Sequence, residues 1–209
     1  MNVQPRAPSL ARPRSTLPAI PLPRPPDPTR PDIRRLRQTL GRFVTGVTVV
    51  ATRDDEGNMV GLTANSFTPL STQSGLLLWS LANKSRSLLA FTRSMDFVVN
   101  VLADDQQEVS RRMSAPVENR FAGLDWQQGD CSGLPIISGC AAWFECRKVS
   151  QYQGGDHQIF IGRIVNCARS DRAPLLYFAG DYAVAHSRDP RELPPAPVGP
   201  SILNATRPS

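Results

Sequence analysis

The sequence predicts an all-β barrel with a few short helices, flanked by two proline-rich segments. Strand-like segments recur in hairpin pairs, and no sustained alternation of strand and helix runs along the chain. Ten of the 20 prolines lie in residues 1–31 and six more in 190–209, which leaves four for everything between. Because proline at this density prevents helices and strand ladders, we expect disordered segments at 1–31 and 188–209 and a folded body at 32–187.

Composition narrows the function classes. The chain of 209 residues has a net charge of +6, of which residues 1–31 carry +4, so the body is nearly neutral. A basic leader can touch nucleic acid, a membrane or an acidic partner, but we expect a solvated arm and no nucleic-acid partner. No apolar run is long enough to span a membrane.

Cysteine and histidine usage predicts no metal site. The chain has two histidines and four cysteines, and no two cysteines form a C-x-x-C pair. No signal peptide opens the chain, so we expect reduced, mostly buried thiols in a cytoplasmic protein.

The body opens with a helix and a hairpin. Asp32 is a suitable N-cap, and apolar residues follow it at helical spacing. These residues are Ile33, Leu36, Leu40 and Phe43. Residues 47–53 and 59–62 read as strands, and the Asp- and Gly-containing turn 54–58 predicts that they pair.

Two further strands alternate with short helices. Residues 76–81, Leu-Leu-Leu-Trp-Ser-Leu, predict a strand buried on both faces. A short helix is expected over 85–93 and a strand over 97–102. Asp104 is expected to cap a helix that runs through Met113.

The last part of the body predicts a second, longer hairpin. Residues 114–139 are rich in glycine and read as loop. Residues 140–152 and 157–168 then read as two long strands joined by the turn 153–156, Gln-Gly-Gly-Asp.

Three common nucleotide and hydrolase motifs are absent. Residues 41–48 imitate a phosphate-binding loop, but Val47 stands where that motif needs lysine. The sequence contains neither G-x-G-x-x-G nor G-x-S-x-G. These absences argue against a nucleoside triphosphatase, a Rossmann cofactor site and an α/β-hydrolase.

The first polar segment that could carry chemistry is 62–71, which follows a strand. It is rich in hydroxyls and backbone N–H groups, and such a loop can hydrogen-bond the edge of a flat heteroaromatic ring. The alternative is an ordinary turn of Asn and Ser.

The second segment is 83–87, Asn-Lys-Ser-Arg-Ser, at the start of the expected short helix. Free N–H groups and two basic side chains at a helix start can bind phosphate. The alternative is an N-cap serine with solvated neighbours.

The third segment is the hairpin tip Gly154–His157. Glycine at such a tip usually serves only to allow positive φ. The other histidine, His186, lies near the end of the body, which singles out His157.

Together these segments, in this order and spacing, resemble the short-chain flavin reductase family over about two thirds of the chain. The matching motifs are Arg42–Val50, Thr63–Thr68, Asn83–Ser87, Phe97–Leu102, Gly154–His157, Pro174–Phe178 and Gly180–Tyr182. The resemblance implies an FMN-binding split β-barrel, antiparallel and Greek-key-like. It implies an NAD(P)H-dependent flavin reductase that supplies reduced flavin to a partner monooxygenase.

The resemblance also implies roles for individual residues in a homodimer. Thr63, Ala64, Asn65 and Ser66 would contact the isoalloxazine ring, with Ser71 adding a hydroxyl; Lys84, Ser85 and Arg86 would hold the phosphate; Gly154, Gly155, Asp156 and His157 would border the nicotinamide. The flavin would be FMN, with FAD possible, and the co-substrate NADH or NADPH. No residue is assigned as an acid, base or nucleophile, because hydride transfer needs positioning and polarisation by the protein.

Two other functions remain open from the residues alone. The same barrel could carry or sense flavin without turning over a nicotinamide. The polar loops could also be plain turns of an all-β dimer. The segment Gly154–His157 favours the reductase, because a carrier has no use for a second nucleotide.

Overall fold

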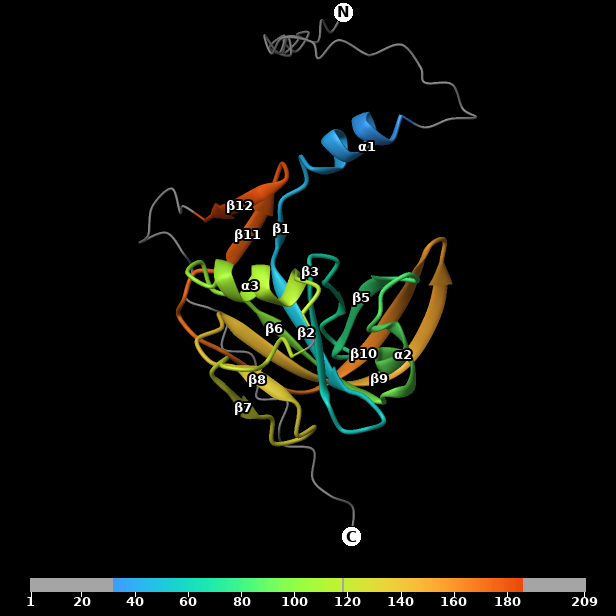
Figure 1. The fold of residues 1–209 in the computed structure, drawn as a ribbon, viewed down its shortest axis with the longest axis vertical. Helices are drawn as coiled ribbons and strands as arrows, with labels where there is room; N and C mark the ends of the chain where they lie inside the picture. Colours follow the sequence, from blue (N-terminus) through green and yellow to red (C-terminus); the bar gives the residue numbers. More distant parts are fainter. Residues whose placement is uncertain (1–31, 118, 186–209) are drawn as a thin grey trace, which may run out of the picture.

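A computed structural model describes residues 32–117 and 119–185 (Figure 1). The predicted leader 1–31 and tail 188–209 lie outside the described residues. The elements in chain order are α1 (Ile33–Leu40), β1 (Thr45–Gly46), β2 (Thr48–Arg53), β3 (Met59–Ala64), β4 (Thr68–Ser71), β5 (Leu76–Ala82), α2 (Leu88–Arg93), β6 (Asp96–Val101), α3 (Gln107–Ser114), β7 (Trp126–Gln128), β8 (Pro135–Ile137), β9 (Ala142–Gly154), β10 (His157–Arg169), β11 (Leu175–Phe178) and β12 (Asp181–Val184).

The main sheet has seven antiparallel strands in the order β3-β2-β6-β9-β10-β5-β4. The sheet curls so that the segment after β3 reaches β5. There the Ser66 hydroxyl donates to the Ser80 carbonyl at 2.9 Å and accepts from the Ser80 N–H at 3.0 Å. This side-chain bridge joins β5 to the segment between the two edge strands, β3 and β4, and closes the barrel. The predicted antiparallel barrel is confirmed.

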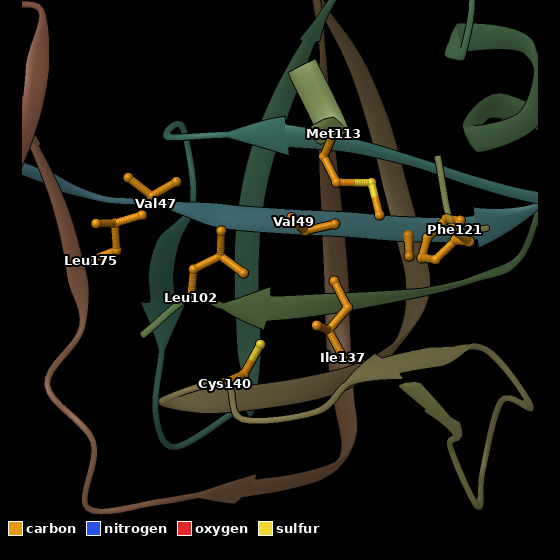
Figure 2. Packing of buried hydrophobic residues seen from close by; sticks show 9 residues of the cluster. Val47, Val49, Leu102, Met113, Phe121, Ile137, Cys140 and Leu175 are labelled. Carbon is orange, nitrogen blue, oxygen red and sulfur yellow. The ribbon is translucent and has the colours of Figure 1, made fainter. Parts of the chain in front are cut away.

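Two hydrophobic cores lie on the two faces of β2, whose residues Thr48–Thr52 are all buried. Val50 faces an aromatic cluster in which Trp79 stacks on Phe160, with ring centroids 4.8 Å apart. Val49 faces the second core, which Figure 2 shows. That core also contains Val47, Ala51, Leu102, Met113, Phe121, Ile137, Cys140 and Leu175. Leu175 comes from β11, so this core ties the smaller sheet β1-β11-β12 to the barrel.

β2 and β6, and not β5, are buried on both faces. Along β5 the pattern alternates, with Leu77, Trp79 and Leu81 buried and their neighbours half-buried. The leucine run hides this alternation because its inward and outward residues have the same chemistry. The expected burial of both faces of 76–81 is therefore wrong.

Both internal helices begin later than the sequence predicts. α2 starts at Leu88 and not at Ser85, since residues 83–87 form turns. α3 starts at Gln107 because Asp104 still belongs to the sheet region, where its N–H donates to the Ala173 carbonyl at 3.0 Å. Gln106 takes the N-cap position, and its side chain accepts from the Ala103 N–H at 2.9 Å.

The first helix is confirmed, but none of its residues is buried. Asp32 caps α1 by accepting from the N–H groups of Arg34 and Arg35. The predicted apolar face, Ile33, Leu36, Leu40 and Phe43, is exposed, and α1 stands away from the barrel (Figure 1). None of the helices in the described part of the chain has the length and apolar character needed to cross a bilayer.

The loop-rich region 114–139 holds a short hairpin that the sequence did not predict, β7 with β8. The expected thiol burial is half right. Cys140 and Cys146 are buried, whereas Cys131 and Cys167 are exposed. Burial raises the pKa of the Cys140 thiol to about 12.

Candidate functional site

The first polar segment lies at the end of β3, the edge strand of the main sheet. The Thr63 hydroxyl donates to the Ser110 carbonyl at 2.7 Å, and the Ala64 carbonyl accepts from the Thr48 hydroxyl at 2.7 Å. The Ser66 hydroxyl donates to and accepts from Ser80, so its proton is used within the barrel and one acceptor lone pair remains.

This segment offers backbone N–H groups to a ligand. Within the described residues, the N–H groups of Asn65 and Ser66 donate no hydrogen bond, and the Asn65 side chain is exposed. Adjacent unpaired N–H groups at a strand end can bind the carbonyl or nitrogen acceptors along the edge of a flat ring. The ligand contact expected here therefore comes from the main chain more than from the hydroxyls.

The second segment, Asn83–Ser87, is a turn that leads into α2. Ser85 is half-buried, and Lys84 and Arg86 are exposed. No ion pair among the described residues uses either of these two basic side chains. α2 has only six residues, so Lys84 and Arg86, and not a helix dipole, supply most of the attraction for an anion here.

Lys148 fixes α2 on the sheet. Its ammonium donates to the carbonyls of Phe91 and Thr92, at 3.0 and 2.5 Å, near the C-terminal end of α2. Burial of this side chain lowers the pKa of Lys148. The turn that carries Arg86 is thus attached to a helix anchored on β9.

The third segment forms the tip of the β9–β10 hairpin. Gly155 has φ +64°, a conformation that the two-residue turn Gly155–Asp156 requires. A Cβ on Gly155 would meet nothing within 4 Å, whereas one on Gly154 would meet Ile159 at 2.9 Å. A side chain at Gly154 would therefore displace the end of the Ile159 side chain, whereas Gly155 leaves open space above the turn.

His157 begins β10 with its ring half-exposed. Its Nδ1 lies 2.7 Å from Asp156 Oδ1, and this contact, with the charge of His157, lowers the pKa of Asp156. The carboxylate therefore sets the orientation of the imidazole through Nδ1.

The three segments meet at one end of β5. His157 pairs with Ala82, the last residue of β5, and the Asn83 N–H donates to the Asp156 carbonyl at 2.8 Å. Ser66 contacts Ser80, two residues earlier on the same strand, which is about 7 Å away at the usual rise of a strand. Segments far apart in sequence thus form one surface.

Two neighbouring cavities extend from this surface and share Ser114. One of about 290 Å³ is lined by Val47, Thr63, Asn65, Ser110, Ser114, Tyr177 and Tyr182. The other, of about 700 Å³, includes Ser85 and Arg86 in its lining and continues between α2 and the 114–120 loop. Figure 1 shows α2 and α3 on either side of β3.

Ser71 is the one predicted residue that the structure does not bring to this surface. It pairs with Leu76, at the other end of β5 from Ala82, and its hydroxyl accepts from the Ser74 N–H. Within one subunit, Ser71 therefore lies apart from the other predicted residues.

Sequence reasoning missed four residues of the smaller cavity: Ser110, Ser114, Tyr177 and Tyr182. The Tyr182 hydroxyl lies 2.9 Å from the Ser110 hydroxyl, so β12 and α3 meet over the end of β3. Tyr177 and Tyr182 stood in motifs of the resemblance without an assigned role. Two serines one helical turn apart on α3 were the only other signal.

The donor set fits a phosphorylated flavin. The acceptor atoms along one edge of a flat ring need donors, which the N–H groups of Asn65 and Ser66, without a partner among the described residues, supply. A phosphate needs positive charge with no competing partner, which Arg86 supplies within the described residues.

Comparison with known proteins agrees with this geometry. The model of the flavin reductase-like domain matches residues 40–186. The chain belongs to this family. A probable flavin reductase of Rhizobium meliloti is 45% identical to this flavin reductase-like chain over 151 residues, which cover 72% of the chain and 48% of that protein. The chain thus spans about half the length of that relative.

Two other members match over most of their length. HsaB of Rhodococcus jostii, the reductase subunit of a flavin-dependent monooxygenase, is 39% identical over 79% of this chain and 83% of its own. The solved NADH:FAD oxidoreductase of Streptomyces globisporus, in complex with NAD and FAD fragments, is 33% identical. It superposes with a TM-score of 0.72 over 78% of this flavin reductase-like chain and 97% of its own.

Proposed function

We propose that this protein is an NAD(P)H-dependent flavin reductase that supplies reduced FMN or FAD to a partner monooxygenase. The observation that carries the proposal is the meeting of three segments at the end of β5. Backbone donors and an arginine that have no partner among the described residues lie on one surface with an open glycine turn, which suits two adjacent nucleotides. The naming of HsaB as a monooxygenase reductase subunit supports the partner.

When both nucleotides are bound, the nicotinamide supplies a hydride and the flavin accepts it. The protein positions them and polarises the acceptor. The N–H groups of Asn65 and Ser66 would face the edge of the ring, beside Thr63 and Ala64, and favour the negative charge that develops there. Lys84, Ser85 and Arg86 would hold the phosphate. Gly154 and Gly155 would let the nicotinamide approach, and His157, oriented by Asp156, would hydrogen-bond it.

The test is a turnover assay with purified protein, NADH or NADPH, and FMN or FAD. We expect the near-ultraviolet absorbance of the reduced nicotinamide to fall only when protein and flavin are both present. Flavin binding without nicotinamide oxidation would contradict the reductase and leave a flavin carrier. Failure to bind any flavin would contradict both.

Replacing His157 by alanine should raise KM for NADH, or lower kcat/KM, by roughly tenfold, about one hydrogen bond of transition-state binding. FMN affinity, measured by fluorescence quenching without NADH, should change little. The matched control is Asp156→Asn, which keeps the turn and should have a smaller effect of the same kind. An equal loss of FMN binding in His157→Ala would place this residue at the flavin instead.

We also propose that the protein is a cytoplasmic homodimer. The apolar face of α1 supports a dimer because Leu36 and Leu40 are exposed in one subunit. The double variant Leu36→Glu/Leu40→Glu should shift the sedimentation coefficient at micromolar concentration towards the monomer value. Gln38→Glu, on the same helix, serves as the control. A wild-type monomer that reduces flavin would refute the dimer.

A further inference from the structure

Three side-chain hydroxyls hold the backbone at the end of β3, from which the Asn65 N–H projects. The Thr63 hydroxyl donates to a carbonyl of α3, and the Ser66 hydroxyl bonds to β5. Between these two contacts, the Ala64 carbonyl accepts from the Thr48 hydroxyl of β2 at 2.7 Å. Contacts to three different elements thus fix the short segment that offers main-chain donors to a ligand.

The bond from Thr48 acts on the peptide group that carries the Asn65 N–H. The Ala64 carbonyl and the Asn65 N–H belong to one planar trans peptide group, so they point in opposite directions. Thr48 lies on β2, which pairs with β3, and β3 is an edge strand. A carbonyl held toward β2 therefore directs the Asn65 N–H away from the sheet, toward its open edge.

The same bond strengthens this N–H as a donor. A hydrogen bond to the carbonyl oxygen polarises the whole peptide group, and hydrogen bonds in series reinforce one another where water is excluded. Thr48 is only 1% exposed, so packing holds its hydroxyl in place and solvent does not compete for it. A donor that is oriented and polarised in advance favours negative charge that develops at the edge of a ring.

We propose that Thr48 is a positioning residue for hydride transfer, whose hydroxyl orients and polarises the Asn65 N–H toward the flavin. It acts through the Ala64–Asn65 peptide group, because its own side chain is buried. This inference rests on the proposed function, which places the Asn65 N–H at the ring. It adds a residue on β2 that lies outside the three polar segments of the site.

The test compares binding of reduced and oxidised FMN, with the reduced form measured without oxygen, and steady-state turnover. Thr48→Val keeps the branched shape and Thr48→Ala leaves space, and both remove the hydroxyl. Each should weaken reduced FMN about tenfold and oxidised FMN less than about threefold, because the lost polarisation matters most when the ring is negative. We expect kcat to fall about tenfold and KM for NADH to stay within about twofold. Thr48→Ser keeps the hydroxyl and should recover most of kcat.

Thr52→Val is the matched control. Thr52 lies on the same strand and is fully buried, and its hydroxyl also donates to a main-chain carbonyl, that of Asp96, at 2.8 Å. This contact is away from the site, so Thr52→Val should lower the melting temperature about as much as Thr48→Val. It should leave kcat and the ratio of reduced to oxidised FMN affinity at their wild-type values.

The possible results separate the positioning role from the proposed function. A wild-type affinity ratio in Thr48→Val and Thr48→Ala would overturn the role of Thr48 and leave the reductase intact. The same conclusion would follow if Thr52→Val shared the change in this ratio, or if Thr48→Ser failed to restore kcat, because the effect would then reflect general destabilisation. A wild-type protein that binds no flavin would overturn both.

Discussion

Replacing Glu145 by alanine should destabilise the protein by about 2–4 kcal/mol, the largest loss we expect from any single side chain outside the aromatic core. Glu145 lies near the start of β9 and is fully buried. One carboxylate oxygen accepts from the N–H groups of Cys131 and Ser132 and from the Ser132 hydroxyl, and the other accepts from Asn166. Removing it leaves four donors without a partner.

The same carboxylate should make stability depend on pH in the acid range. Burial alone would raise the pKa of Glu145, but hydrogen bonds from Ser132, Asn166 and Cys131 outweigh it and hold the pKa below its usual value. A lowered pKa in the folded state means that this stability is present above the pKa of the unfolded chain and is lost as pH falls through the folded value. Glu145→Gln should flatten this part of the stability curve.

Urea unfolding followed by circular dichroism, from pH 7 down to about pH 3, measures both effects. Glu108→Ala is the control, because Glu108 is exposed and pairs with Arg111 on its own helix. We expect this substitution to change the free energy of unfolding by less than about 0.5 kcal/mol. Gly129→Ala gives a second test, since a Cβ there would lie 2.2 Å from the Glu145 carboxylate. Wild-type stability in both Glu145→Ala and Gly129→Ala would contradict the stabilising role of the Glu145 hydrogen bonds.

The β2–β3 and β9–β10 hairpins could be predicted from sequence because their signals are local. Turn residues such as those at 54–58 and 153–156 set the chain direction wherever they occur, and both hairpins are present. The predicted first residues of the two helices, at Ser85 and Asp104, were wrong because non-local contacts decide where these helices begin. The Asp104 N–H is taken by Ala173, which is distant in sequence, so no local pattern reveals that the helix must wait for Gln106.

The candidate site also combines segments that local sequence patterns predict with contacts that they do not. The three segments were found because each carries a dense local pattern of polar residues. Their meeting depends on the pairing of β5 with β10 and on the Ser66–Ser80 bridge, which no local pattern encodes. Tyr182 was missed for this reason, since its hydroxyl bonds to Ser110 on α3, which is 72 residues earlier.

Replacing Arg86 by alanine should weaken FMN binding by about 1.5–3 kcal/mol, roughly 10- to 150-fold, the range for hydrogen bonds to charged groups. Arg86 lines the larger cavity beside Ser85 and pairs with no carboxylate among the described residues. Arg86 is exposed and makes no ion pair within the described residues, so its removal should not lower the melting temperature. The loss should appear in binding alone.

Riboflavin separates the electrostatic role of Arg86 from a structural one, because it has the same ring and no phosphate. Its affinity should fall less than twofold in Arg86→Ala, and raising the salt concentration should reduce the wild-type advantage for FMN over riboflavin, since salt screens exposed charges. Arg147→Ala is the matched control: Arg147 is also exposed, but it pairs with Asp96 and does not line the cavity, so both flavins should bind as they do to wild type. If FMN and riboflavin lose affinity equally in Arg86→Ala, the side chain shapes the turn before α2 and does not bind the phosphate. In that case the anion site would have to be sought at Lys84, next to the Asp156 carboxylate, whose pKa the charge of Lys84 helps to lower.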